Sequence, residues 1–161
     1  MSVFIIAEIG INHNGSMDLA KELIHHCKKS GADSAKFQMR NIGALYRNDQ
    51  DYKDEDLSSQ YVLDILNKFN LSNEQMFELF DYCKKIDIMP MCTPWDQISF
   101  DALEEYGMSY YKTASADLTN HQLLTSIAET GKKMFVSTGM STENEISQTN
   151  DLLKRLKADY V

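Results

Sequence analysis

The chain has 161 residues, of which 43% are hydrophobic and 25% are charged, so it can bury one core beneath a polar surface. Sixteen Lys and Arg residues against 24 Asp and Glu residues give a formal net charge of −8, which disfavours a nucleic-acid partner. No apolar run approaches the roughly 18 residues of a membrane span, and the N-terminus lacks the basic region of a secretory signal. We therefore expect a cytoplasmic protein with no membrane partner. Three cysteines without C-x-x-C spacing predict neither a disulfide framework nor a zinc ribbon.

Short apolar runs rich in β-branched and aromatic residues alternate with amphipathic segments along the chain. This alternation is typical of an α/β fold with a parallel sheet. No repeat or linker is evident, so residues 1–161 are predicted to lack an internal domain boundary. The predicted strands are residues 4–10, 34–38, 86–92, 110–114 and 134–138, and residues 159–161 begin a sixth.

Helix-capping residues precede the amphipathic segments and predict where each helix begins. Residues 41–71 differ, because a charged stretch at 47–56 precedes a short apolar pattern. We interpret this segment as a long loop that carries its own helix. The predicted caps are Ser16, Ser72 with Gln75, Asp96, Asn120, and Thr142 with Glu145.

The strand spacing suits either a doubly wound sheet or a (β/α)8 barrel. The turn after the first strand reads GINHNG, which is not a glycine-rich nucleotide loop. Nearly every predicted strand ends in polar residues, and a barrel gathers those ends into one mouth. The sequence therefore favours a TIM barrel, of which this chain covers five βα units and the start of strand six.

Two lysines, Lys36 and Lys112, lie within apolar strands. Because a buried charge is costly without a partner, we expect both to face the barrel interior or its mouth and to bind an anion. Thr93, Ser115 and Ser137 could add neutral donors for a phosphate or carboxylate. In a purely structural interpretation, each lysine only pairs with a strand carboxylate.

The carboxylates at the predicted strand ends are Glu8 and Asp117, which could orient a substrate hydroxyl or move a proton. They could equally form salt bridges to the two lysines. The four histidines form no H-x-H and no i, i+4 pair, so no complete metal site is predicted within these 161 residues. We interpret His13 as a residue that its turn tolerates.

Five short motifs follow one another along the chain: IIAEIGINHNG (5–15), SAKFQ (34–38), CTPWD (92–96), YYKTASADLTN (110–120) and FVSTGM (135–140). In order and spacing they resemble the N-terminal catalytic barrel of the sialic acid synthase family. That family includes the N-acetylneuraminate, legionaminate and pseudaminate synthases. The resemblance covers almost the whole chain.

The resemblance implies a transferase that condenses phosphoenolpyruvate with an N-acylated amino sugar of the N-acetylmannosamine type. The products would be a nine-carbon 2-keto sugar acid and phosphate, in the cytoplasmic biosynthesis of cell-surface polysaccharide. It also implies that Glu8 and Asp117 are catalytic, and that Gln38 and Asp117 contact the sugar. Phosphoenolpyruvate would be held by Lys36, Thr93, Lys112, Ser115 and Ser137.

A family barrel has eight strands in about 250 residues. We therefore expect the divalent metal, Mn²⁺ or Mg²⁺, to take its ligands from beyond Val161. We also expect either a homo-oligomer such as a dimer or completion of the barrel by further chain. Unpaired strand edges would leave Phe4, Ile6, Phe135 and Val136 poorly covered. Two alternatives stay open: an incomplete barrel that acts as a phosphoenolpyruvate-binding or assembly module, and a TIM-barrel aldolase with Lys112 as its Schiff base.

Overall fold

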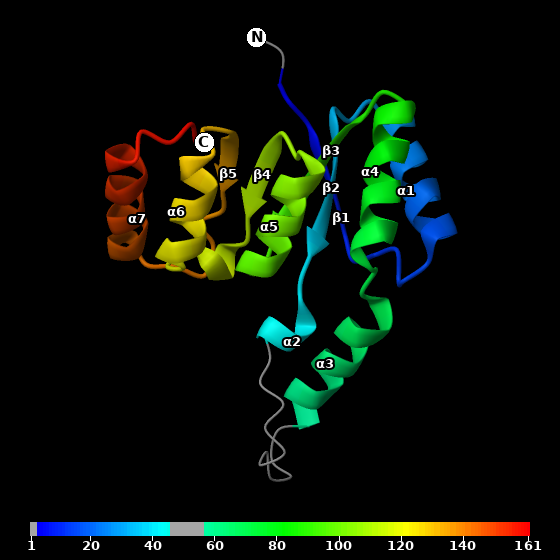
Figure 1. Cartoon of the computed structure of the whole chain (residues 1–161), viewed down its shortest axis with the longest axis horizontal. Helices are drawn as coiled ribbons and strands as arrows, with labels where there is room; N and C mark the ends of the chain where they lie inside the picture. Colours follow the sequence, from blue (N-terminus) through cyan, green and yellow to red (C-terminus); the bar gives the residue numbers. More distant parts are fainter. Residues whose placement is uncertain (1–2, 46–56) are drawn as a thin grey trace. The chain divides into compact units, whose positions relative to one another are not determined.

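The structure is a computed structural model that describes residues 3–45 and 57–161, with the backbone alone for residues 57–62 (Figure 1). The chain divides into two compact units, with the boundary between Pro90 and Met91. In each unit the strands that follow one another in sequence pair in parallel and are joined by helices. This confirms the predicted α/β fold with parallel strands. The charged stretch at 47–56 lies outside the described residues.

In the first unit, two parallel strands are covered by two long helices. Its elements in chain order are β1 (Ile6–Gly10), α1 (Met17–Lys29), β2 (Ser34–Met39), α2 (Ile42–Leu45), α3 (Leu57–Phe69) and α4 (Asn73–Lys85). The helix α3 confirms the helix predicted within residues 41–71. β3 (Met89–Pro94) begins at the end of this unit, where the Met89 amide donates to the Asp33 carbonyl oxygen at 3.0 Å.

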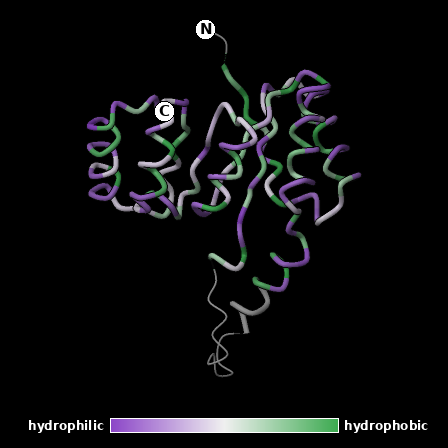
Figure 2. Tube along the Cα trace, viewed as in Figure 1, coloured by the Kyte–Doolittle hydropathy of each residue, from purple (hydrophilic) through white to green (hydrophobic). Residues whose placement is uncertain are grey.

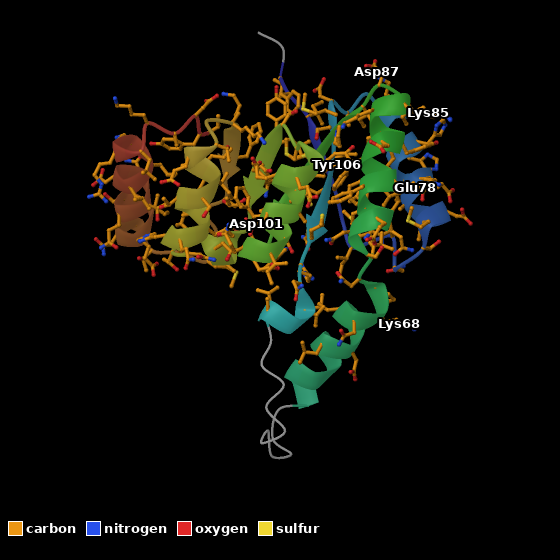
Figure 3. The ribbon with its side chains drawn as sticks, in the orientation of Figure 1. Lys68, Glu78, Lys85, Asp87, Asp101 and Tyr106 are labelled. Atoms are coloured by element: carbon orange, nitrogen blue, oxygen red, sulfur yellow. The ribbon has the colours of Figure 1, made fainter. Side chains whose placement is uncertain are left out.

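The helices α1 and α4 lie side by side and pack on β2 (Figure 1). Figure 2 shows hydrophobic and hydrophilic residues alternating along both helices, so each has one apolar face. Glu78, marked on α4 in Figure 3, accepts a hydrogen bond from Lys21 of α1 at 2.6 Å. The buried side chains between the helices and the strands include Ala20, Ile24, Phe37, Leu79 and Phe80.

The loop after β1 is held by a buried histidine. His13 is only 2% exposed, and its Nδ1 accepts a hydrogen bond from the Gly15 amide at 3.1 Å. Gly15 has a φ of 76°, and a Cβ there would lie 3.0 Å from the Lys68 carbonyl oxygen, so only glycine fits. Our interpretation of His13 as merely tolerated is therefore wrong, because its ring nitrogen satisfies a backbone donor of the turn.

In the second unit, β3 pairs in parallel with β4 (Tyr110–Thr113), and β4 pairs in parallel with β5 (Lys133–Val136). The residues after α7 (Glu143–Arg155) return to β5, where the Val161 amide donates to the Met134 carbonyl oxygen at 3.0 Å. Tyr160 forms an isolated parallel bridge with Met134, at the position where the sequence predicts the start of a sixth strand. The remaining elements are α5 (Gln97–Tyr106), β4 (Tyr110–Thr113), the short 3-10 helix η1 (Ser115–Asp117), α6 (His121–Glu129), β5 (Lys133–Val136) and α7 (Glu143–Arg155).

A buried tyrosine joins β4 to α5 in the second unit. Tyr111 is fully buried, its ring centroid is 5.4 Å from that of Phe100, and its hydroxyl donates to Glu104. Lys132 donates to the same carboxylate at 2.6 Å. Burial and the neighbouring Glu104 carboxylate both raise the pKa of Tyr111, so the hydroxyl stays protonated and keeps donating.

The helix starts follow the predicted caps closely. Side chains of all five predicted cap residues accept hydrogen bonds from backbone amides, and two of them form complete capping boxes. The third strand is displaced from its predicted range of 86–92 to Met89–Pro94. The reason is the end of α4, where Ile86 caps the helix and Asp87 takes a left-handed φ of 59°, so these residues form a turn.

Exposure agrees in part with the predicted uncovered residues. Phe4 is 44% exposed, whereas Ile6, Phe135 and Val136 are half-buried. Within residues 3–45 and 57–161, no helix combines the length and apolar character needed to cross a membrane.

Removing one buried hydroxyl should loosen α7 from the segment after η1. The Thr149 hydroxyl donates to the Leu118 carbonyl oxygen at 2.7 Å, and both residues are buried. We expect Thr149→Val to lower the free energy of unfolding by about 1–3 kcal/mol, because the carbonyl loses its donor without access to water. Urea denaturation measures this. The exposed Ser147→Ala in the same helix should change little, and equal stability of the two variants would contradict the assignment.

The buried His13 should make stability depend on pH. Desolvation lowers the pKa of His13 in the folded chain, so the unfolded chain binds the proton first as the pH falls. The His13 contribution is thus fully present above the unfolded pKa of about 6.5 and is lost progressively as the pH falls through and below it. Denaturation of wild type and His13→Gln between pH 7.5 and 5 should show a smaller loss in the variant. The exposed His121→Gln is the control, and a slope unchanged by His13→Gln would refute this origin.

Candidate functional site

An ion pair lies across the two strands of the first unit. The parallel register places Glu8 of β1 opposite Lys36 of β2, and the Lys36 Nζ lies 2.5 Å from a Glu8 carboxylate oxygen. The Lys36 side chain is 3% exposed, whereas that of Glu8 is 50% exposed. Lys36 therefore does pair with a strand carboxylate, as the purely structural interpretation expects. Half of the Glu8 side chain nevertheless stays open to solvent, so the pair can still meet a solute.

Gln38 lies on the same side of β2 as Lys36, because side chains of a strand alternate between its faces. The Arg40 Nη2 donates to the Gln38 Oε1 at 2.6 Å. On β1, Gly10 lies beside the Gln38 amide nitrogen, since a Cβ at Gly10 would be in van der Waals contact with that atom at 3.6 Å. Gln38 is half-buried. The first unit therefore brings Glu8, Lys36 and Gln38 together along the adjoining strands β1 and β2.

A second lysine site lies at the ends of β4 and β5. The Lys112 Nζ donates to the Ser137 Oγ at 2.8 Å. Ser137 is two residues beyond Phe135, the register partner of Lys112, which places the two polar side chains on one side of the strand pair. An ammonium group and a hydroxyl in contact can both donate to one anion.

The turn after β4 contributes Ser115 and approaches the loop after β5. A Cβ at Gly139 would lie 3.0 Å from the Ser115 Oγ, so a larger residue there would displace the Ser115 hydroxyl slightly. Thr93, the last but one residue of β3, is 1% exposed and is the most buried of the predicted site residues of the second unit. Ser115 therefore lies close to the backbone that follows Ser137.

Asp117 ends η1 in a half-buried position. Its Oδ1 accepts a hydrogen bond from the Asn120 side-chain Nδ2 at 3.2 Å, while its buried Oδ2 has no hydrogen-bond partner among the described residues. Desolvation raises the pKa of Asp117, the Asn120 hydrogen bond opposes that rise, and the charge of Asp96 adds to it. A carboxylate oxygen that is buried without a donor is poised to accept a hydrogen bond from a ligand hydroxyl.

The described residues do not by themselves supply a divalent-metal site. Within residues 3–45 and 57–161, no group of three or more His, Cys, Asp or Glu side chains is arranged to hold an ion. Each unit has its own lysine site, Lys36 with a neighbouring carboxylate and Lys112 with a neighbouring hydroxyl, and an ammonium group of this kind can bind an anion.

Three residues beside the predicted site were not assigned to it from the sequence. Arg40 contacts Gln38, Asn120 contacts Asp117, and His13 holds the loop after β1. The period-two alternation of a strand would have placed Arg40 beside Gln38. Nothing in the sequence showed the burial of His13.

A model of the NeuB family matches residues 23–161. The uncharacterized protein MJ1065 of Methanocaldococcus jannaschii is 40% identical, over 94% of this chain and 42% of its own length. The N,N'-diacetyllegionaminic acid synthase of Campylobacter jejuni is 36% identical, over 92% of this chain and 46% of its own. This chain therefore spans less than half the length of these curated relatives.

Among solved structures, the N-acetylneuraminic acid synthetase of Leptospira borgpetersenii, in complex with citrate, aligns with a TM-score of 0.88 and 26% identity. The alignment covers 99% of this chain and 53% of that one. These similarities confirm the resemblance that the five sequence motifs carry. With the family model covering residues 23–161, the chain belongs to the NeuB family.

Proposed function

We propose that the protein condenses phosphoenolpyruvate with an N-acylated amino sugar of the N-acetylmannosamine type, giving a nine-carbon 2-keto sugar acid and phosphate. It would thus be a transferase that forms a carbon–carbon bond, built on a (β/α)8 barrel of which this chain covers about five βα units and the start of strand six. The observation that carries the proposal is the buried Lys36, held by the half-exposed Glu8 on adjoining parallel strands. Membership of a family with synthases among its named relatives supports the same reaction class.

In this proposal the lysines bind phosphoenolpyruvate, which carries a phosphate and a carboxylate. Lys36 and Lys112 neutralise this charge, as ammonium groups do for phosphate in other sites. The hydroxyls of Thr93, Ser115 and Ser137 add neutral donors. The contact between Lys112 and Ser137 supports this role, because it orders two donors beside each other before any ligand arrives.

The acids handle the sugar and the protons. The methylene carbon C3 of phosphoenolpyruvate attacks the carbon of the open-chain aldehyde and forms the new carbon–carbon bond, and the aldehyde oxygen takes up a proton to become a hydroxyl. Water adds at C2, which carries the phosphate, and phosphate then leaves by cleavage of the C2–O bond to give the 2-keto acid. Glu8, next to Lys36 and half-exposed, would accept the proton of that water. Asp117, with one oxygen lacking a partner among the described residues, would accept a hydrogen bond from a sugar hydroxyl, while Gln38 also contacts the sugar.

The divalent metal expected from the resemblance, Mn²⁺ or Mg²⁺, stays part of the proposal. The side chains described for residues 3–45 and 63–161 do not fit it by themselves, so no step is assigned to it. A homo-oligomer likewise remains proposed.

Removing either lysine should weaken phosphoenolpyruvate binding. In the full-length protein, Lys36→Met and Lys112→Met should each lose about 1.5–3 kcal/mol of binding free energy, because each removes a charge-assisted contact. Isothermal titration calorimetry with phosphoenolpyruvate measures this. The exposed Lys154→Met is the matched control and should bind normally. Unchanged affinity in both site variants would refute the anion site, and borohydride trapping of a keto acid on Lys112 would favour an aldolase.

Changing Asp117 should affect the sugar and spare phosphoenolpyruvate. Asp117→Asn keeps the shape but replaces a carboxylate oxygen by an amide, so we expect the KM for the amino sugar to rise or turnover to fall. The phosphoenolpyruvate affinity should stay within about twofold, because the lysines are untouched. Steady-state kinetics with each substrate varied in turn separates the two effects. Equal losses for both substrates would mean that Asp117 only supports the lysine site.

A further inference from the structure

We propose that Arg40 is a positioning residue that turns the side-chain amide of Gln38 so that its N–H groups face the amino sugar. The sugar would then be recognised through an acceptor oxygen. This rests on the proposed function, in which Gln38 contacts the sugar. Arg40 itself acts only through Gln38.

The geometry begins with the alternation along β2. Lys36, Gln38 and Arg40 occupy every second position, so they share one side of the strand and its extension. On the other side, Phe37 and Met39 are buried in the core. Arg40 follows the last residue of β2, and its carbonyl oxygen accepts a hydrogen bond from the Asn70 side-chain Nδ2 at 3.4 Å. The backbone at Arg40 is thereby tied to the segment that follows α3.

The contact between Arg40 and Gln38 decides which way the amide points. A guanidinium group only donates hydrogen bonds, so the glutamine atom that it contacts must be the oxygen. The distance of 2.6 Å between the Arg40 Nη2 and the Gln38 Oε1 is that of a charge-assisted hydrogen bond. The orientation of the amide is therefore a chemical necessity of the pair.

The amide nitrogen faces Gly10 of β1. A Cβ at Gly10 would lie 3.6 Å from the Gln38 Nε2, in van der Waals contact, so the glycine leaves this nitrogen without a side chain against it on that side. The two N–H groups can therefore donate to a ligand that lies beside Lys36 and Gln38. Without Arg40, the amide could rotate by 180° and present its oxygen, which would repel the acceptor that it now attracts.

Kinetics on the full-length protein test this role. Arg40→Met should raise the KM for N-acetylmannosamine about 5- to 20-fold, while kcat and the KM for phosphoenolpyruvate change less than twofold. Arg40→Lys should recover part of the loss, because an ammonium group also only donates. Arg155→Met, which removes an exposed arginine from α7, is the matched control and should leave all constants unchanged.

A double-mutant cycle separates positioning from simple support of the fold. Because Arg40 acts through Gln38, Arg40→Met should add no further rise in the sugar KM once Gln38→Met is present. In ¹⁵N-labelled protein, Arg40→Met should also shift the side-chain NH₂ resonances of Gln38 while the backbone resonances of β1 stay in place.

The outcomes distinguish the two proposals. Additive effects, an unchanged sugar KM, equal losses for both substrates, or unshifted Gln38 resonances would overturn the role of Arg40 and leave the proposed function intact. If the wild-type protein consumes phosphoenolpyruvate but accepts no amino sugar of this type as its second substrate, the proposed function is overturned, and the role of Arg40 with it.

Discussion

The buried ammonium group of Lys36 constrains the first unit more than any other feature. A lysine that is 3% exposed is strongly destabilising unless an anion lies beside it, and the parallel register of β1 and β2 supplies Glu8 at 2.5 Å. A slip of one residue in this register would turn Glu8 away from Lys36 and leave the charge buried alone. The ion pair thus sets the alignment of the strands on which Glu8, Lys36 and Gln38 lie.

The second unit also holds a lysine, but this lysine contacts a neutral hydroxyl group. Lys112 is only half-buried and contacts the Ser137 hydroxyl, while the Asp117 carboxylate is partly desolvated. One Asp117 oxygen is engaged by Asn120 and the other is buried with no hydrogen-bond partner among residues 3–45 and 57–161. If only stability mattered, we would expect an apolar group at such a position, or a polar group with a hydrogen-bond partner. Unfavourable polar burial of this kind is typical of functional sites, where the missing partner is a ligand.

Glycines and buried polar side chains order the loops that lie next to these charged groups. Gly15 permits an approach to the Lys68 carbonyl that a Cβ would obstruct, Gly139 lies close to the Ser115 side chain, and His13 satisfies an amide inside the first of these loops. Thr149 does the same for the carbonyl that follows η1. The loops that carry candidate ligand-binding groups are therefore ordered by hydrogen bonds from within each unit. This order lowers the entropic cost of binding.

The sequence by itself determined the local structure and the family. The capping residues, the βα alternation and the five motifs act over a few residues, so the helix starts, the parallel α/β class and the resemblance to sialic acid synthases could all be predicted from them. Where the prediction failed locally, as at the start of β3, a helix cap and a left-handed Asp87 displaced the strand. Tertiary structure alone decided that Lys36 is paired with Glu8 and that His13 is buried. It also decided that Asp117 keeps an oxygen without a partner among the described residues, and that Arg40 contacts the side-chain oxygen of Gln38. These depend on strand register, burial and side-chain orientation, which arise from contacts between residues distant in the chain and leave no local pattern in the sequence.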